Sequence, residues 1–455
     1  MTTSRLSIAL DLTESRLPLT VISLAWPVLL EQSLVTAVGL VNTIMVGHLG
    51  ATSLTAVGLG TQAVQFPQVV VNGLAVGATA VIARRIGAGN PREASVAVHQ
   101  SLFLAALVAL IFVPTQWILA RQLMLLLRAR PDAADLGSIY IHAAAPGMIP
   151  GLIMMSANAA MRGSGNTRRP MMAMMTTNVT NALVGYVLIY GAFGMPALGV
   201  QGAGIASAIG WLVGCTMSLT FLARGVGALR LSFGRAFLPH GSIVGSILKV
   251  GFPSCLEQAQ TQIAFILFSV IFSALGTKVY AAQTVALRVE NIAFMPGFGL
   301  GVAATTLVGQ ALGAGRPDLA ERAGRLAQWY AVAIMSAAGL IMGVFRYQLM
   351  AIFIDDVEVI SIGVWGILLY AFSLPFMGTS NCLAGSLRGA GDTRVVLISM
   401  TASCWLVRLP LAYFLAYGAD LGAIGAWTAA VLDLATRGVL MWWRFSTGRW
   451  KTIRV

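Results

Sequence analysis

The sequence predicts an all-α membrane protein with twelve transmembrane helices, arranged as two six-helix lobes that a pseudo-two-fold axis relates as parallel repeats. Three observations support this fold class: the composition, the number of long apolar runs, and a repeat at half the chain length. Of the 455 residues, 57% are hydrophobic and only 10% are charged, whereas a soluble domain carries about 25% charged residues. The composition therefore excludes a soluble enzyme, a disordered chain and a coiled coil.

Twelve apolar runs are long enough to cross a membrane, because a helix needs roughly 20 residues to span about 30 Å of hydrocarbon. The breaks between the runs combine glycine, proline and charge, and no strands of alternating polar and apolar residues occur in the sequence, which argues against a β-barrel. The predicted spans lie near 18–45, 54–82, 95–117, 138–160, 171–191, 203–222, 243–272, 280–308, 324–345, 361–384, 395–417 and 422–443.

The first sixteen residues carry charged side chains and lack a short apolar region followed by a cleavage site. We therefore expect no removable signal peptide, and the first apolar run stays as a span.

The distribution of Lys and Arg predicts the orientation. The N-terminus, the even-numbered loops and the C-terminus hold 21 of the 29 basic residues, and the odd-numbered loops hold five. Basic residues concentrate on the cytoplasmic side of a membrane protein. We therefore expect a multi-pass protein of the plasma (inner) membrane with both termini in the cytoplasm. The same bias accounts for the net charge of +13 without a nucleic-acid partner.

The second half of the chain repeats the first at one constant spacing. WPVLLEQ at 26–32 matches FPSCLEQ at 252–258, and RGSGNTR at 162–168 matches RGAGDTR at 388–394. The spacing that separates Pro27 from Pro253 holds without a gap across this stretch, so chance does not explain it. The sequence therefore contains an internal duplication.

Six spans in each half give both halves the same orientation in the membrane. Such parallel repeats are typical of secondary transporters, whose substrate site lies near the midplane between two lobes that rock against each other. We expect an N-lobe over 1–223, a cytoplasmic linker over 224–242 and a C-lobe over 243–455. The alternative is a duplicated structural bundle with no transport role.

The motifs of both halves resemble those of the MATE (multidrug and toxic compound extrusion) family. The resemblance rests on PVLLEQ…VGLVNTIMVGHLG, RIGAGNPREA and MRGSGNTRRP, then on FPSCLEQ, the segment ENIAFMPGFGLGVAATTLVGQALGAGRPDLA and LRGAGDTR, in order along the whole chain. It implies a two-lobed antiporter that expels organic, often cationic, compounds by using a gradient of protons or sodium ions.

Three positions depart from better-known branches of that family. Asn42 stands where the first helix often carries Asp. One branch has a Glu in the seventh helix that would align with Thr261; here the acid of that helix is Glu257, one turn earlier. The same branch has an Asp in the tenth helix that would align near Met377. The coupling mechanism therefore does not transfer directly from the resemblance.

Glu31 and Glu257 are the acids that the repeat places at equivalent positions inside the spans, each near mid-span and four residues after a proline. A charge at the centre of a span costs roughly 2.5–3.5 kcal/mol on insertion scales, so it normally faces a cavity or a partner. Burial favours the protonated form of a carboxyl. We expect Glu257 to be the main ion-coupling group, Glu31 the second, and Asn42 a neutral ligand nearby. Alternatively, each carboxyl hydrogen-bonds the helix that its proline interrupts.

A second polar site is predicted in the C-lobe. Glu290 lies seven residues after Gln283, hence on the same helix face, and its repeat partner Val64 is apolar. We expect a polar substrate or cavity site that combines Gln283 and Glu290 with Gln258 and Thr261. In the alternative reading, Arg288 neutralises Glu290 as a structural pair.

Asp433 and Arg437 stand at i and i+4, which favours an ion pair on one helix, and Arg408 on the preceding helix competes for Asp433. Arg408 and Asp433 are therefore candidate polar residues of the cavity, or alternatively part of a buried ion pair that joins the last two helices.

No bound cofactor is expected beyond the coupling ion, H⁺ or Na⁺. The four histidines have no metal-ligand spacing, and no GxxxxGK[ST] motif is present to hold ATP.

Two other functions compete with the antiporter for small organic compounds. A flippase for a lipid-linked glycan should line its cavity with several basic residues for pyrophosphate, and only Arg288 and Arg408 are plausible candidates for that role. A membrane-embedded enzyme needs a catalytic set of His, Asp or Ser in register, which the spans lack. The chain is therefore expected to be a transporter and not an enzyme, a monomer whose partners are its organic substrates and the lipid bilayer.

Overall fold

The computed structural model describes residues 16–231 and 240–453, and these residues are helical apart from short connections. This follows from the membrane composition, because backbone N–H and C=O groups in hydrocarbon must be satisfied within the segment, as an α-helix does. The helices of the first half are α1 (Leu17–Gly47), α2 (Ala51–Gly87), α3 (Pro91–Ile118), α4 (Ala120–Leu126), α5 (Pro131–Gly163), α6 (Arg168–Tyr190), η1 (Ala192–Gly194) and α7 (Gly199–Arg224).

The second half begins with α8 after the segment that the structure leaves undescribed, and it ends in a helix of α and π turns followed by α15. Its elements are α8 (Gly241–Ala274), α9 (Thr277–Gly313), α10 (Pro317–Val344), α11 (Arg346–Ala351), α12 (Val357–Ala390), α13 (Thr393–Ala402), η3 (Ser403–Arg408), α14 (Leu409–Tyr413), η4 (Phe414–Gly418), α15 (Gly422–Ser446) and η5 (Arg449–Thr452).

Twelve helical segments within the described ranges are long and apolar enough to cross a membrane. They coincide with the twelve predicted spans, so the prediction of twelve transmembrane helices is confirmed. Several helices run past their apolar stretch: α2 continues through Arg84 and Arg85, which lie in its last turn. A helix does not end where hydrocarbon ends, and cations in a last turn also interact favourably with the helix dipole.

The internal repeat is present in the structure. Helices α2 and α9, α3 and α10, and α5 and α12 begin at equivalent positions of the repeat, each pair with the spacing of Pro27 and Pro253. The turns repeat as well: Gly165 and Gly391, in the RGSGNTR and RGAGDTR segments, have φ angles of 87° and 86°. Only glycine adopts such angles without strain, so these glycines form tight turns between helices, as the motifs predict.

The chain forms two compact units, and their boundaries differ from those of the predicted lobes. One unit contains Leu30–Cys255; the other contains α1 up to Leu29 and the chain from Leu256 onward. Both crossings lie two residues after a proline inside a helix, Pro27 in α1 and Pro253 in α8. Proline removes one backbone hydrogen bond and disfavours a straight helix, so each proline marks where its helix changes unit.

Close backbone contacts fix the exchanged half-helices. In the first unit, a Cβ on Gly73 of α2 would overlap the Cys255 sulfur, and one on Gly77 would overlap the Ile247 carbonyl oxygen. In the second unit, a Cβ on Gly299 of α9 would meet Leu29 at 3.0 Å. Only glycine at these positions lets the helices approach so closely.

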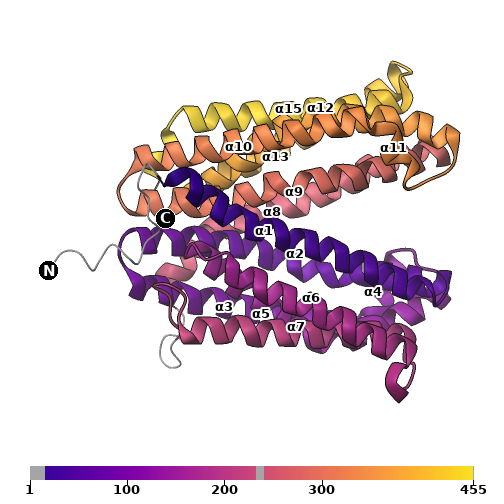
Figure 1. Cartoon of the computed structure of the whole chain (residues 1–455), viewed down its shortest axis with the longest axis horizontal. Helices are drawn as coiled ribbons and strands as arrows, with labels where there is room; N and C mark the ends of the chain where they lie inside the picture. The colour runs from indigo at the N-terminus through magenta and orange to yellow at the C-terminus, as the bar shows by residue number, and fades with distance from the viewer. Residues whose placement is uncertain (1–15, 232–239, 454–455) are drawn as a thin grey trace. The chain divides into compact units, whose positions relative to one another are not determined.

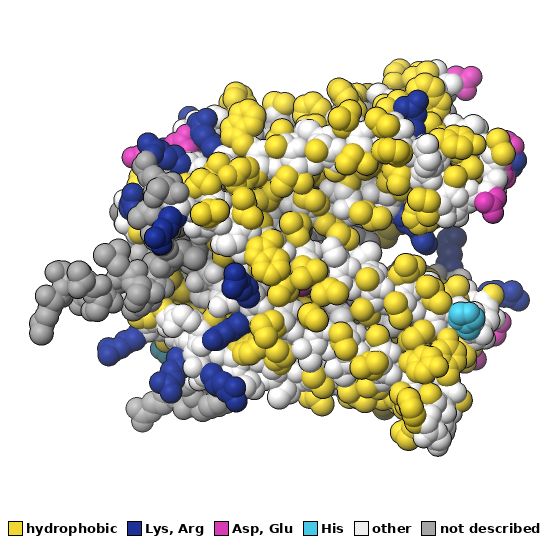
Figure 2. Space-filling view, viewed as in Figure 1, with side chains coloured by type: hydrophobic (Ala, Val, Ile, Leu, Met, Phe, Trp, Pro, Cys, Tyr) yellow, Lys and Arg dark blue, Asp and Glu magenta, His cyan; other side chains and the backbone are white. Residues whose placement is uncertain are grey.

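Each unit has the surface of a membrane protein. The visible flanks of its helices carry mainly hydrophobic side chains, and Lys and Arg gather toward helix ends (Figure 2). Within each unit the long helices run side by side, as α5, α6 and α7 do in Figure 1. The predicted linker over 224–242 lies partly outside the described residues, as does the N-terminus before residue 16.

Candidate functional site

Glu31 forms an ion pair in the first unit. Its Oε1 accepts a hydrogen bond of 2.5 Å from an η nitrogen of Arg162, the next-to-last residue of α5. The Glu31 side chain is only 7% exposed and that of Arg162 is 21% exposed. The middle of α1 therefore meets the last turn of α5 through a charge-assisted hydrogen bond, which is stronger than a neutral one.

Glu257 forms the same pair in the second unit. Its Oε1 accepts a hydrogen bond of 2.5 Å from Arg388 in the last turn of α12, with exposures of 8% and 24%. In both units the two partners are 131 residues apart in the chain. The repeat therefore reproduces a buried acid together with its base.

The second oxygen of each carboxylate is buried and makes no hydrogen bond among the described residues: these atoms are Glu31 Oε2 and Glu257 Oε2. A carboxylate with one oxygen held by a guanidinium and the other unbonded has a specific place for a proton or a cation. Leaving such an oxygen unsatisfied costs free energy, so these two atoms require an explanation beyond packing.

A larger buried polar network lies in the second unit around Asp433 of α15. Its carboxylate accepts a hydrogen bond from Arg437 Nε at 2.9 Å and one from the Ser403 hydroxyl at 2.5 Å. Arg408 lies 3.6 Å from the same carboxylate and stacks on the Phe268 ring at 4.3 Å. Asp433 is fully buried. The predicted Asp433–Arg437 ion pair and its competitor Arg408 are confirmed.

Glu290 of α9 is buried next to this network. The charges of Arg408 and Arg437 act on its carboxyl, while no hydrogen bond to it is described. Arg288, the alternative partner suggested by the sequence, is exposed and forms no ion pair among the described residues. The positive charges that act on Glu290 therefore belong to Arg408 in η3 and Arg437 in α15. Arg288 lies on a different side of α9.

Gln283 lies on the same helix as Glu290 and joins two aromatic residues. Its amide nitrogen donates to the Tyr370 hydroxyl at 3.1 Å, and its carbonyl oxygen accepts from Trp427 Nε1 at 2.5 Å. All three side chains are buried. These hydrogen bonds connect α9 to α12 and α15.

Gln258 and Thr261, predicted to complete this site, form no described hydrogen bond with Gln283 or Glu290. Thr261 donates to the Glu257 carbonyl at 2.7 Å and accepts from Gln260 at 2.9 Å. Gln258 is half-buried and takes part in no described hydrogen bond. A threonine hydroxyl inside a helix often bonds the carbonyl four residues earlier, and this local bond occupies Thr261.

Asn42 belongs to a neutral network in the first unit. It donates to the Asn181 carbonyl oxygen at 2.8 Å, and Asn181 donates to the Ser207 hydroxyl at 3.2 Å. Amides and hydroxyls do not titrate near neutral pH. This network of the first unit is therefore neutral, and among the described residues Asn42 forms no hydrogen bond with Glu31 or Arg162.

The sequence interpretation missed Arg162 and Arg388, although a signal for them exists. The repeat contains a duplicated acid in PVLLEQ and FPSCLEQ and a duplicated base in RGSGNTR and RGAGDTR. Buried charges need partners, so the repeated acid and the repeated base could have been matched. Tyr370 and Trp427 carried no such signal, because single aromatic residues in apolar runs are ordinary packing.

Comparison with known proteins agrees with this architecture. The MatE family model matches residues 27–187 and 253–414, two segments that begin at the equivalent prolines of the repeat. A protein of Thermotoga maritima described as a probable multidrug resistance protein, NorM, is 30% identical over 94% of this chain and 92% of its own length. The multidrug resistance protein PmpM of Pseudomonas aeruginosa is 28% identical over 95% of this chain and 92% of its own length.

Solved structures show the same fold. A transporter of the MOP superfamily from Pyrococcus furiosus, whose description reports a reversed polarity of its binding pocket, matches with a TM-score of 0.88 and 25% identity over 95% of this chain and 97% of that one. The bent form of the Vibrio cholerae MATE transporter VcmN matches with a TM-score of 0.88 and 22% identity, again over 95% and 97%. The family model covers most of the chain in both halves, so the chain belongs to the MatE family and is a multi-pass membrane transporter, not an enzyme.

Proposed function

We propose that this chain exports amphipathic, cationic organic compounds across the plasma membrane in exchange for protons, as a monomer that works by alternating access. The names of its relatives NorM and PmpM support multidrug efflux. The observation that supports ion coupling is the Glu257 carboxylate: one oxygen bonds Arg388, and the other is buried and makes no hydrogen bond to any residue that the structure describes.

Glu257 is the proton acceptor in this proposal. With the carboxylate ionised, the ion pair with Arg388 holds the middle of α8 to the end of α12. A proton on Oε2 removes the charge of Glu257 and weakens its attraction to Arg388. A ligand shifts a conformational equilibrium only through its different affinity for the two states. A proton that weakens the contact between α8 and α12 binds more tightly to the state in which this contact is broken.

Glu31 is the secondary acceptor, because Arg162 holds it in the same way and its Oε2 also has no hydrogen-bond partner within the described ranges. The Asn42–Asn181–Ser207 network of this unit contains no titratable group among its described members. Proton coupling in the first unit therefore depends on Glu31 alone among its buried acids.

Glu290 is the anchor for the cationic substrate. Its buried carboxylate has no described hydrogen bond, and its helix α9 contributes Ala286 and Val289 to the buried apolar core that also contains Phe268 and Tyr370. A cation with an apolar body gains from both groups. The positive charge of the substrate would then interact with the Glu290 carboxylate in place of the charge of Arg408. Arg408 is also attracted to Asp433, which lies 3.6 Å away.

Efflux from proteoliposomes under separately imposed gradients tests the proposal. We expect a proton gradient to drive the export of a fluorescent organic cation and a sodium gradient alone to drive none. Transport driven only by a sodium gradient would show that the coupling ion is Na⁺ and not H⁺. Failure to move any of a broad panel of cations, together with movement of a lipid-linked glycan, would overturn the exporter and favour a flippase.

A further inference from the structure

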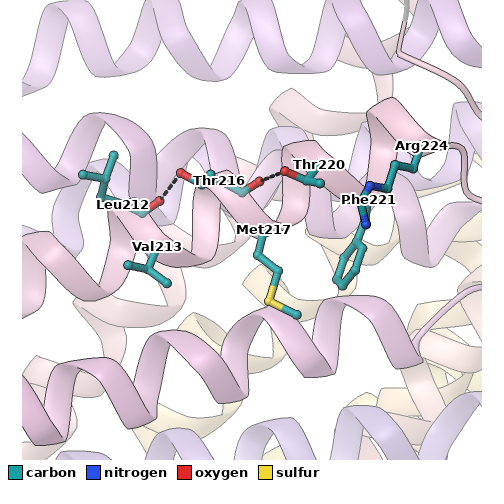
Figure 3. Close-up of a pocket in the computed structure, with 7 residues that line it drawn as sticks. All are labelled: Leu212, Val213, Thr216, Met217, Thr220, Phe221 and Arg224. Carbon is teal, nitrogen blue, oxygen red and sulfur yellow. Dashed lines mark hydrogen bonds between the residues drawn. The ribbon is translucent and has the colours of Figure 1, made fainter.

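A groove runs along one face of α7 in the first unit, with a volume of about 490 Å³, within the roughly 300–1,000 Å³ of typical ligand sites. Leu212, Val213, Met217 and Phe221 supply its apolar wall, and Thr216 and Thr220 the rest of its length. Figure 3 shows these side chains in a row along the helix, with Phe221 and Arg224 at one end. Both threonine hydroxyls donate to carbonyls of α7 itself, at 2.8 and 2.7 Å, so the groove presents mainly apolar surface.

Two guanidinium groups stand at the Arg224 end of the groove. Arg224 ends α7 and is exposed. Arg169, near the start of α6, donates to the Gly225 carbonyl at 2.5 Å and lies 5.5 Å from the centre of the Phe221 ring. Neither arginine forms an ion pair within the part of the chain that the structure describes. The groove is therefore apolar along its length, and at its end it carries two positive charges that no described acid neutralises.

The equivalent place in the second unit has a different charge balance. Helices α7 and α15 begin and end at matching glycines with positive φ, Gly199 and Gly422 at the start and Gly225 and Gly448 after the end. Alignment of the two helices on these glycines places Arg444 opposite Phe221. Arg444 donates to Asp392 at 2.8 Å.

The first unit has no acid in that position. The repeat places Asn166 opposite Asp392, and Asn166 uses its side-chain oxygen to accept from the Arg169 backbone N–H at 3.1 Å. Arg224 and Arg169 are replaced in the second unit by Thr447 and Val395. The second unit thus neutralises its basic residue internally, whereas the first unit leaves two cations for a group from outside.

We propose that an anionic phospholipid occupies this groove, with an acyl chain along the apolar face of α7 and its phosphate between Arg224 and Arg169. The groove lies on a transmembrane helix, where acyl chains are the surrounding solvent. Arginine binds phosphate through charge-assisted hydrogen bonds, and basic sites at the cytoplasmic ends of membrane helices bind anionic headgroups. The lipid stabilises the α6–α7 corner of the first unit, and this role is independent of the substrate and the coupling ion.

Native mass spectrometry of the full chain in detergent tests the site. The protein is titrated with phosphatidylglycerol, with phosphatidylcholine of identical acyl chains, and with glycerol phosphate as a headgroup without chains. The variants are Arg224→Gln, the double variant Arg169→Gln/Arg224→Gln, and Thr216→Trp, which fills the groove but keeps both cations. The matched control is Arg92→Gln/Arg316→Gln, which removes two exposed arginines at the starts of α3 and α10.

We expect wild type and the control to retain one phosphatidylglycerol in preference to phosphatidylcholine and not to bind glycerol phosphate. The double variant should bind it about tenfold or more weakly, since each basic residue near an anionic membrane surface contributes roughly 1 kcal/mol. Thr216→Trp should also weaken binding. Because Arg169 bonds the end of α7, the single Arg224→Gln variant guards against a folding effect. Equal phosphatidylglycerol retention by wild type, Arg224→Gln and the double variant would overturn the proposal, as would an equal loss in the control or tight binding of glycerol phosphate.

Discussion

Arg388 donates a hydrogen bond of 2.5 Å to Glu257, and the first half of the chain reproduces this pair at the same separation with Arg162 and Glu31. Both pairs lie close to the place where α1 or α8 changes unit, at Leu29 and at Cys255. Each arginine therefore holds the half-helix that remains in its own unit. In our proposal, ion coupling depends on the carboxylates of these two pairs, Glu257 first and Glu31 second.

Breaking one partner of the pair should destabilise the protein more than removing both. Arg388→Gln leaves the Glu257 carboxylate buried without a counter-charge, which typically costs about 3–5 kcal/mol. Glu257→Gln/Arg388→Gln should recover part of this loss. Thermal unfolding in detergent measures the effect, with Arg162→Gln and Glu31→Gln/Arg162→Gln as the matched series in the other unit. Strict additivity of the two single substitutions would show that the pair contributes no coupling energy.

Asp433 should be essential for stability. Asp433→Asn removes the charge that offsets Arg437 at 2.7 Å and Arg408 at 3.6 Å, and we expect a loss of about 3–5 kcal/mol. Glu290→Gln should cost less, because no hydrogen bond to that carboxylate is described. Comparing the apparent Tm of the two variants checks the order, and a larger loss for Glu290→Gln would contradict it.

Close packing of α8 on α2 predicts a steric effect at Gly73. In Gly73→Ala the new Cβ would overlap the Cys255 sulfur and lie 2.5 Å from the Cys255 backbone nitrogen. Overpacking of this kind typically costs about 1–3 kcal/mol. Gly39→Ala on α1 has nothing within 4 Å of the new Cβ and should be neutral or slightly stabilising. Equal Tm values for the two variants would argue against the packing of α8 on α2.

Orientation in the membrane can be checked at Ser242, which is exposed at the start of α8. Basic residues predict that this end of α8 faces the cytoplasm. A Ser242→Cys variant, made with the four native cysteines replaced by alanine, should resist an impermeant thiol reagent in intact cells and react in everted vesicles. Thr52→Cys, exposed at the start of α2, is the control that should react from outside. Labelling of Ser242→Cys in intact cells would reverse the predicted topology.

Most of the fold could be predicted because membrane helices follow from composition. Long apolar runs predicted the twelve spans, and the repeat predicted two related halves. The exchange of half-helices at Leu29 and Cys255 could not be predicted, since the apolar pattern of α1 and α8 is continuous across the crossing. Pro27 and Pro253 indicated a break in each helix but not that the two parts pack in different units.

The candidate site was less predictable because it depends on which residues meet in space. The repeat singled out Glu31 and Glu257, and the i, i+4 spacing found Asp433 with Arg437. Arg288 was a wrong suggestion as the partner of Glu290, because nearness along a helix says little about which face a side chain occupies. Gln283 was predicted to share a site with Glu290, but the hydrogen-bond partners that the structure gives it, Tyr370 and Trp427, come from helices distant in the sequence.

Proton-driven efflux in proteoliposomes that contain the Glu257→Gln variant measures whether Glu257 couples transport to protons. Glutamine keeps the shape of the side chain and can still accept a hydrogen bond from Arg388, so the substitution removes the titration and leaves a folded protein. We expect Glu257→Gln to abolish efflux driven by a proton gradient and Glu31→Gln to slow it less, with both variants correctly inserted and monodisperse. Wild-type rates with unchanged pH dependence in both variants would contradict proton coupling by these groups: the two carboxylates would then be structural, and Glu290 and Asp433 would become the candidates for ion coupling.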